Sequence, residues 1–172
     1  MHAALLRSSA VVVAIIVGFA SAVSATVYNL HTDMDGLQMV PPNASPAFGA
    51  GDFTLDDTTG NFTVISGTYQ DLLGGSNSIL LNVGAPGVSG AFIATLTNDT
   101  PGAASGTYSG GATLAAGPMA SMLAGDTYIR VTSSVFPSGE IRGQLFVVPE
   151  PSSLGLIGLG LFGLAMRRRV RA

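Results

Sequence analysis

Few residues in this chain are suited to catalysis. Its 172 residues include two histidines, His2 and His31, and no cysteine. A zinc or copper centre needs three or four nitrogen or sulfur ligands around one ion, and a serine nucleophile needs a neighbouring base. Beyond the first residues His31 is the sole candidate base, and no Gly-x-Ser-x-Gly elbow occurs. The sequence therefore argues against both chemistries, and we expect His31 to be a surface residue at a strand end.

Acidic neighbours occur at two places, Asp33 with Asp35 and Asp56 with Asp57. A glycosidase needs two carboxylates roughly 5 to 10 Å apart in a cleft, whereas calcium takes oxygen ligands from loops. Aspartates in turns commonly accept hydrogen bonds from their own backbone, and no EF-hand spacing is present. We expect no cofactor, with calcium binding at these loops left as an alternative.

Glu140 and Arg142 lie two residues apart on an expected strand, so both side chains should project from one face. Such a pair can orient a ligand. The interpretation we prefer is structural: with the flanking Gly139 and Gly143, the pair forms a salt bridge or hydrogen-bond clasp that fastens the last strand to a neighbouring loop. We therefore expect no catalytic residue and no enzymatic activity.

The body of the chain predicts an all-β fold. Turn residues recur every eight to twelve positions, a spacing typical of a sandwich or barrel. We expect one antiparallel β-sandwich of Greek-key type, like the immunoglobulin or superoxide dismutase sandwich, with a hairpin at 56–60 and a long flexible loop at 98–111. The predicted strands are 26–31, 48–55, 61–69, 78–83, 91–96, 128–133 and 140–147, and the one predicted helix is 118–124.

Charge excludes some partners. Between residues 26 and 147 the chain has two arginines, Arg130 and Arg142, no lysine, and nine acidic residues. Two cations on an acidic domain argue against binding nucleic acid or anionic lipid through charge. The absence of cysteine means that packing and strand pairing alone must hold the fold.

The first residues have the layout of a secretory signal peptide. Arg7 precedes an apolar stretch at 10–20, and small residues follow up to Ala25. The stretch is well short of the ~20 residues that a spanning helix needs. We expect signal peptidase to cleave after Ala25, with Ala22 as the alternative site.

The last residues combine a Pro-Glu-Pro motif, a short apolar segment and an arginine cluster. The apolar segment, 154–166, makes about 20 Å of helix against a hydrocarbon core of ~30 Å, and the arginines should stay on the cytoplasmic side. A single-pass tail anchor is one interpretation. The residues concerned are Pro149, Glu150 and Pro151 for processing, and Arg167, Arg168, Arg169 and Arg171 for membrane retention.

In that order, these three parts resemble the PEP-CTERM sorting signal of Gram-negative bacteria. The resemblance implies recognition by an exosortase-type membrane transpeptidase and removal of the short transmembrane helix near the Pro-Glu-Pro motif. It also implies an inner-membrane-anchored precursor, followed by delivery to the cell surface or the extracellular matrix.

A second resemblance covers roughly residues 27–146. The stretches 35–42, 123–131 and above all 136–145, Phe-Pro-Ser-Gly-Glu-Ile-Arg-Gly-Gln-Leu, look like a CHRD domain, the module first described in chordin. The resemblance implies an antiparallel β-sandwich with an extracellular binding or matrix role. Many bacterial members carry histidines on a central strand and after the Tyr-x-x-Val strand. The corresponding stretches 78–82 and 131–133 have none, which removes the basis for a metal or redox role here.

The combined hypothesis has three parts: a signal peptide at 1–25, a CHRD-like sandwich at 26–147, and a sorting signal at 148–172. We expect an exported, non-enzymatic surface or matrix protein that binds polysaccharide or other surface partners. The alternatives are a secreted enzyme acting on polysaccharide and a calcium-binding matrix module.

Overall fold

The computed structural model describes residues 25–149, and the predicted signal peptide and C-terminal apolar segment lie outside them. The described part is all-β with one helix, α1 (Ala116–Leu123). No helix in this part is long and apolar enough to cross a membrane. The strands are β1 (Val27–Asp35), β2 (Phe48–Asp56), β3 (Asn61–Gln70), β4 (Ser76–Val83), β5 (Phe92–Asn98), β6 (Gly106–Ser109), β7 (Gly111–Thr113), β8 (Thr127–Ser133), β9 (Ile141–Gln144) and β10 (Phe146–Val147).

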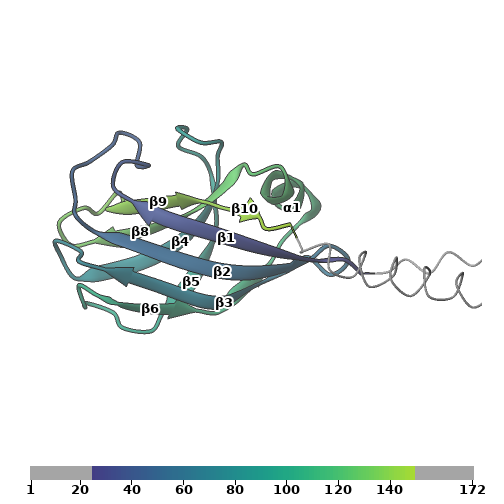
Figure 1. The fold of residues 1–172 in the computed structure, drawn as a ribbon, viewed down its shortest axis with the longest axis horizontal. Coiled ribbons are helices and arrows are strands. Elements are labelled where there is room, and N and C mark those ends of the chain that lie inside the picture. Colours follow the sequence, from purple (N-terminus) through teal and green to yellow (C-terminus); the bar gives the residue numbers. More distant parts are fainter. Residues whose placement is uncertain (1–24, 150–172) are drawn as a thin grey trace, which may run out of the picture.

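The strands form a closed antiparallel barrel, so the predicted β-sandwich is wrong. The order around the barrel is β1, β2, β3, β6, β5, β4, β8 and β9. The ring closes because β1 also pairs with β9, Asp35 opposite Arg142, and with β10, Leu30 opposite Val147. Figure 1 shows the last strands running beside β1. Alternating strands and frequent turns are common to sandwiches and barrels, and closure depends on a pairing between the two ends of the domain.

Apolar side chains fill the barrel interior. Phe53 and Phe62 stack with their ring centroids 5.1 Å apart, and Tyr108 lies against Phe53 at 6.4 Å. Tyr108 needs glycine beneath it, because a Cβ at Gly67 would lie 2.5 Å from its ring and one at Gly51 would lie 2.3 Å from its hydroxyl. Burial raises the pKa of the Tyr108 phenol. Along β2 inward side chains alternate with outward ones, and residues 49, 51, 53 and 55 are buried.

Residues 98–111 are not the single flexible loop that we predicted. They contain β6, which pairs with β3 and β5 and is needed to complete the ring. The buried Tyr69 hydroxyl organises the approach to β6, with Ser76 Oγ at 2.8 Å and Thr100 Oγ1 at 2.9 Å. Short strands of Gly, Thr and Ser have the composition of a loop, so their assignment depends on neighbours elsewhere in the chain.

Two local predictions are confirmed. Gly60, at the end of the 56–60 hairpin, has a φ of 72°. The predicted helix exists as α1, which begins two residues earlier and ends one residue earlier than predicted, and the predicted stop Gly125 has a φ of 80°. Gly125 N donates to Met122 O and Asp126 N to Ser121 O, the bond pattern of a Schellman stop. Both features depend on local backbone geometry, which the sequence encodes directly.

Candidate functional site

The outer faces of β8 and β9 form one wall of the barrel. Ile141 and Leu145 belong to the core, so Arg142 and Gln144 point away from it. In the same row, Arg142 lies opposite Arg130 and Gln144 lies opposite Tyr128. We call these four outward residues, Tyr128, Arg130, Arg142 and Gln144, the covered wall.

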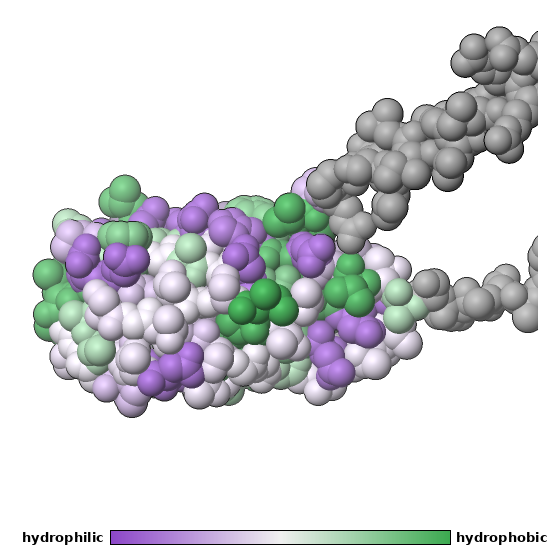
Figure 2. Space-filling view, turned by 60° about the horizontal axis from the view of Figure 1, so that its bottom comes forward, coloured by the Kyte–Doolittle hydropathy of each residue, from purple (hydrophilic) through white to green (hydrophobic). Residues whose placement is uncertain are grey.

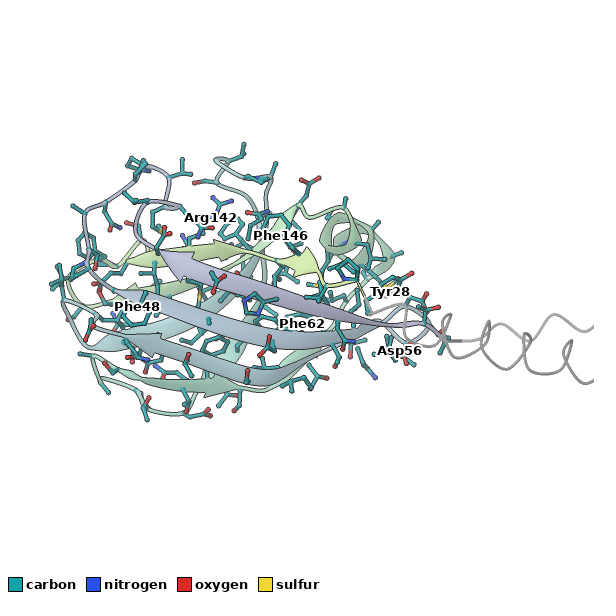
Figure 3. All side chains as sticks on the ribbon, in the orientation of Figure 1. Tyr28, Phe48, Asp56, Phe62, Arg142 and Phe146 are labelled. Carbon is teal, nitrogen blue, oxygen red and sulfur yellow. The ribbon has the colours of Figure 1, made fainter. Side chains whose placement is uncertain are left out.

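Two projecting loops cover this wall. They are residues 36–47 between β1 and β2, and residues 84–91 between β4 and β5. Figure 1 shows both loops standing out from the barrel beside β9, and Figure 3 shows Arg142 between them. Arg142 is 2 % exposed and Gln144 is 4 % exposed, although both point out of the barrel.

A pocket of about 270 Å³ lies between the loops, and we call it the Arg142 pocket. Its walls are mostly aliphatic or proline, and its polar groups come from two glutamines and the arginine. Leu37, one of the lining residues, is 75 % exposed. The lining residues are Leu37, Gln38, Met39, Val40, Pro42, Pro86, Gly87, Arg142 and Gln144.

The Arg142 guanidinium holds the 84–91 loop. Its Nη1 donates to Val88 O and its Nη2 to Ala85 O, each at 2.9 Å. The second Nη2 bond goes to Gln144 Oε1 at 3.0 Å, and the guanidinium carbon lies 3.6 Å from the centroid of the Tyr128 ring. Burial lowers the pKa of Arg142, and the neighbouring Arg130 charge lowers it further. Both ion pairs among residues 25–149 involve His31, so no carboxylate there compensates Arg142.

Gln144 joins three segments at the base of the pocket. Its Nε2 donates to Gly84 O at 2.8 Å and to Gly125 O at 2.7 Å. Its backbone N–H donates to Gln38 Oε1 at 3.3 Å, and Gln38 Nε2 donates to Asp33 O at 2.9 Å. The amide groups that line the pocket are therefore largely engaged by the protein itself.

Glu140 does not pair with Arg142, and it lies just before β9 rather than inside it. Its side chain is fully buried. Oε1 accepts from Ser45 Oγ and from Leu73 N, both at 2.6 Å, and Oε2 accepts from the Ser133 hydroxyl. Glu140 therefore ties loop 36–47 and the segment before β4 to the end of β8, while Arg142 holds the other loop.

The two glycines of the motif allow close approach. At Gly139, φ is 130°, and a Cβ would lie 2.5 Å from Met39 Cε and 2.6 Å from Arg130 Cδ. At Gly143, a Cβ would lie 2.3 Å from Thr32 Oγ1 on β1. These glycines let Met39 sit on the covered wall and let β9 close against β1.

His31 lies in the middle of β1, not at a strand end as predicted, on a second wall formed by the outer faces of β1, β2 and β3. Its Nδ1 lies 2.7 Å from Asp52 Oδ1, and Ser66 Oγ donates to Asp52 Oδ2 at 2.8 Å. The hydrogen bond to Asp52 raises the pKa of His31, and the same bond lowers the pKa of Asp52. We call His31, Asp52 and Ser66 the bare wall, because His31 is half-buried, the other two are exposed, and no loop in the described part of the chain covers them.

The bare wall is not a nucleophile–base pair. Asp52 stands between the serine and the histidine, so the Ser66 hydroxyl donates to a carboxylate and not to the imidazole. A base that activates serine must itself accept the hydroxyl proton. The arrangement is a surface hydrogen-bond row across three strands.

Of the four acidic neighbours singled out in the sequence, Asp35, Asp56 and Asp57 act as turn and terminus acceptors, whereas Asp33 Oδ1 lies 3.4 Å from His31 Nε2. Asp35 Oδ1 accepts from Gln38 N at 2.8 Å, and Asp57 Oδ1 accepts from Thr26 N at 3.0 Å. Asp56 Oδ1 accepts from the backbone of Thr58 and Thr59, bonds that lower its pKa. No group of three or more His, Cys, Asp or Glu within residues 25–149 is arranged to hold a metal.

The two predicted processing sites meet at one end of the barrel. Ala25 and Pro149 line the same groove, of about 660 Å³, because β10 runs antiparallel to the start of β1. Figure 3 shows Tyr28 and Asp56 at this end, where the chain leaves the described part on both sides. Glu150, Pro151 and the four C-terminal arginines lie outside the described residues.

Sequence reasoning missed Tyr128, Arg130, Gln144 and both covering loops. Strand alternation places Gln144 on the face of Arg142, which was a usable signal. To predict the partners on β8, the β8–β9 register had to be known, and to predict the pocket, the position of loops far from β9 in sequence had to be known.

On the side of β3 and β6, Figure 2 shows strongly apolar residues in small separate groups.

Comparison with known proteins supports both resemblances. Residues 30–145 match the family model of the CHRD domain, and residues 147–169 match the PEP-CTERM protein-sorting motif. No curated protein and no solved structure matches the chain. The sorting motif marks an exported protein that an exosortase recognises and that is sorted to the surface of a Gram-negative bacterium. The CHRD match covers the barrel from β1 to the end of β9, and the chain therefore belongs to the CHRD domain family.

Proposed function

We propose that this protein is a non-enzymatic surface module that binds a partner protein of the cell surface or extracellular matrix through the Arg142 pocket. The observation that carries this proposal is the pocket itself, with apolar walls set between two loops that project from a closed barrel. Leu37 at its rim is 75 % exposed, and Val88 on the opposite loop is 53 % exposed. Exposed apolar side chains around a buried arginine are typical of protein interaction sites.

A binding role fits the chemistry of the polar residues. Glu140, the most deeply buried acid, has its carboxylate oxygens engaged by Ser45, Leu73 and Ser133. On the bare wall the serine faces a carboxylate. These groups are engaged in holding loops and strands together, which favours a structural role over an acid–base role.

A protein partner suits the pocket better than a polysaccharide. Recognition of sugar hydroxyls needs several open hydrogen-bond groups, whereas Gln38 and Gln144 are engaged with the backbone. The lining also has no aromatic ring on which a sugar could stack. Aliphatic and proline walls match an apolar side chain.

The direct test is site-specific photo-cross-linking on the surface of the native host. A benzophenone amino acid replaces Leu37, and in a matched protein it replaces Val135, which is 54 % exposed on another loop. We expect a discrete adduct of polypeptide mass from position 37 and not from position 135. Equal adducts from both positions would contradict the proposal, as would an adduct that glycan depolymerisation removes and protease does not.

A further inference from the structure

The Arg142 pocket holds a positive charge that no carboxylate among residues 25–149 neutralises. Arg142 and Arg130 are the two arginines of the described residues, and they are direct cross-strand partners. Like charges opposite each other on a sheet are unfavourable. Neither forms an ion pair with a carboxylate in residues 25–149. Asp35 lies opposite Arg142 on β1, but its Oδ1 accepts from Gln38 N instead.

Both arginines have side-chain N–H groups that donate to no acceptor among residues 25–149. A guanidinium has five N–H groups, and Arg142 uses three, toward Val88, Ala85 and Gln144. Arg130 donates from Nη1 to Ser138 O, while its buried Nε has no acceptor in the described part of the chain. A buried cation with unused donors is costly unless an anion approaches it. Arg142 itself lines the pocket, so an anion in the pocket would reach it.

The volume, lining and charged surroundings of the pocket limit which kind of anion it can bind. At about 270 Å³ it falls just below the roughly 300 Å³ of the smallest drug-sized sites, so it suits one terminal residue and not an extended acyl chain. Its walls favour an apolar body, and the surrounding acidic domain disfavours a dense polyanion. A single carboxylate beside an apolar side chain satisfies all three conditions.

We propose that the Arg142 pocket captures the C-terminal carboxylate of a partner polypeptide whose last side chain is apolar. The inference rests on the proposed function, since it specifies which part of the partner protein is held. Arg142 neutralises the carboxylate, and Leu37, Met39 and Pro86 enclose the last side chain. Terminal carboxylate capture is an established mode of peptide recognition.

The test uses the mature protein isolated from its host and fluorescent hexapeptides of sequence Gly-Ser-Gly-Ser-Ala-X, with X being Val, Leu, Phe or Ser. Each peptide is made as the free acid and as the amide, so that one charge is the only difference. We expect at least one apolar-ended acid to bind tenfold or more tightly than its amide, and the serine-ended acid to bind weakly. Equal affinities for acid and amide would overturn the inference, as would equal affinities for serine-ended and apolar-ended acids.

Two variants locate the binding. Leu37→Asp places a carboxylate at an exposed rim position and should lower acid-peptide affinity at least tenfold, whereas Val135→Asp should not change it. Because Arg142 also holds a loop, Arg142→Lys, which keeps a positive charge, is compared with Arg142→Met. We expect the lysine variant to keep part of its affinity for the acid peptide and the methionine variant to lose it. Unchanged binding in Leu37→Asp would place the site elsewhere and overturn the inference.

The two proposals fail separately. A polypeptide adduct at position 37 with no preference for acid over amide would leave the surface-binding function standing and remove the carboxylate. Acid-selective peptide binding without any adduct in the host would keep the chemistry of the pocket and remove the proposed function. If sodium glucuronate displaces the peptides at an equal concentration, the site is one for acidic sugars and the inference is overturned.

Discussion

The covered wall and the bare wall both consist of outward side chains of the same barrel, yet they differ in solvent exposure and in hydrogen-bond partners. On the covered wall Arg142 is 2 % exposed and its guanidinium has three protein acceptors. On the bare wall the Asp52 side chain is 59 % exposed and the His31 side chain 41 %. The strands are alike, so the difference comes from the loops.

Loops 36–47 and 84–91 convert an outward strand face into an interior. Once covered, an arginine loses water and must find acceptors in the loops themselves, which is why Arg142 bonds to Ala85 and Val88 carbonyls. On the bare wall water remains the competitor, and ion pairs contribute little. The comparison teaches that loop cover, and not strand sequence, decides which outward side chains of this barrel are buried.

The largest expected effect is at Glu140, beneath the covered wall. Glu140→Ala leaves the Ser45, Ser133 and Leu73 donors without their buried acceptor, and we expect a loss of about 3 kcal/mol in the free energy of unfolding. Glu140→Gln keeps the shape and should lose less. Urea denaturation measures both. A loss under about 0.5 kcal/mol for the alanine variant would show that the Glu140 hydrogen bonds do not stabilise the fold. A catalytic turnover that is lost in Glu140→Gln while stability is unchanged would indicate an enzyme.

Gly139 is the next most sensitive position. Its φ of 130° and the contact with Met39 mean that Gly139→Ala should cost about 2 kcal/mol. Gly87→Ala is the matched control, because Gly87 also has a positive φ but its Cβ would meet nothing within 4 Å. The control should lose about 1 kcal/mol. Equal losses in thermal unfolding would mean that packing of Met39 on the wall has no energetic weight.

Arg142→Met should change the loop more than the fold. Removing a buried cation relieves its desolvation, which offsets part of the lost hydrogen bonding, so we expect about 1 kcal/mol of global destabilisation. Amide exchange in residues 84–91 should rise markedly. Arg130→Met is the control, since Arg130 bonds to Ser138 and not to that loop. Exchange that is unchanged in Arg142→Met would show that the loop is held by other contacts.

The smallest effect is expected on the bare wall. His31→Ala should cost a few tenths of a kcal/mol because the pair with Asp52 is exposed. Because the pKa of His31 is raised by folding, the stabilisation that His31 contributes is fully present below pH 6.5 and is lost as the pH rises through its folded pKa. Because the pKa of Asp52 is lowered by folding, the stabilisation that Asp52 contributes is fully present above pH 3.8 and is lost as the pH falls through its folded pKa. The difference between wild type and His31→Ala should therefore be greatest between about pH 4 and 6.5. A flat difference from pH 4 to 9 would contradict the pairing.

Sequence reasoning succeeded where the information is local. The Gly60 turn, the Gly125 helix stop and the long strands follow from backbone conformation and alternation. It failed where distant segments meet: the β1–β9 closure that makes a barrel, the recruitment of β6 by Tyr69, and the covering of Arg142 by two loops. The two-residue spacing of Glu140 and Arg142 could be read from the sequence, but their different hydrogen-bond partners could not. Four of these partners, Ser45, Leu73, Ala85 and Val88, lie more than 50 residues away along the chain.

The central claim, that the covered wall and its pocket hold the protein to a surface partner, is tested most directly by retention. The measurement is the fraction of protein kept in the washed cell-surface layer of the host for wild type, Leu37→Asp and Val135→Asp. The account predicts several-fold release of Leu37→Asp into the culture fluid, with Val135→Asp retained like wild type. Equal retention of all three proteins would contradict it.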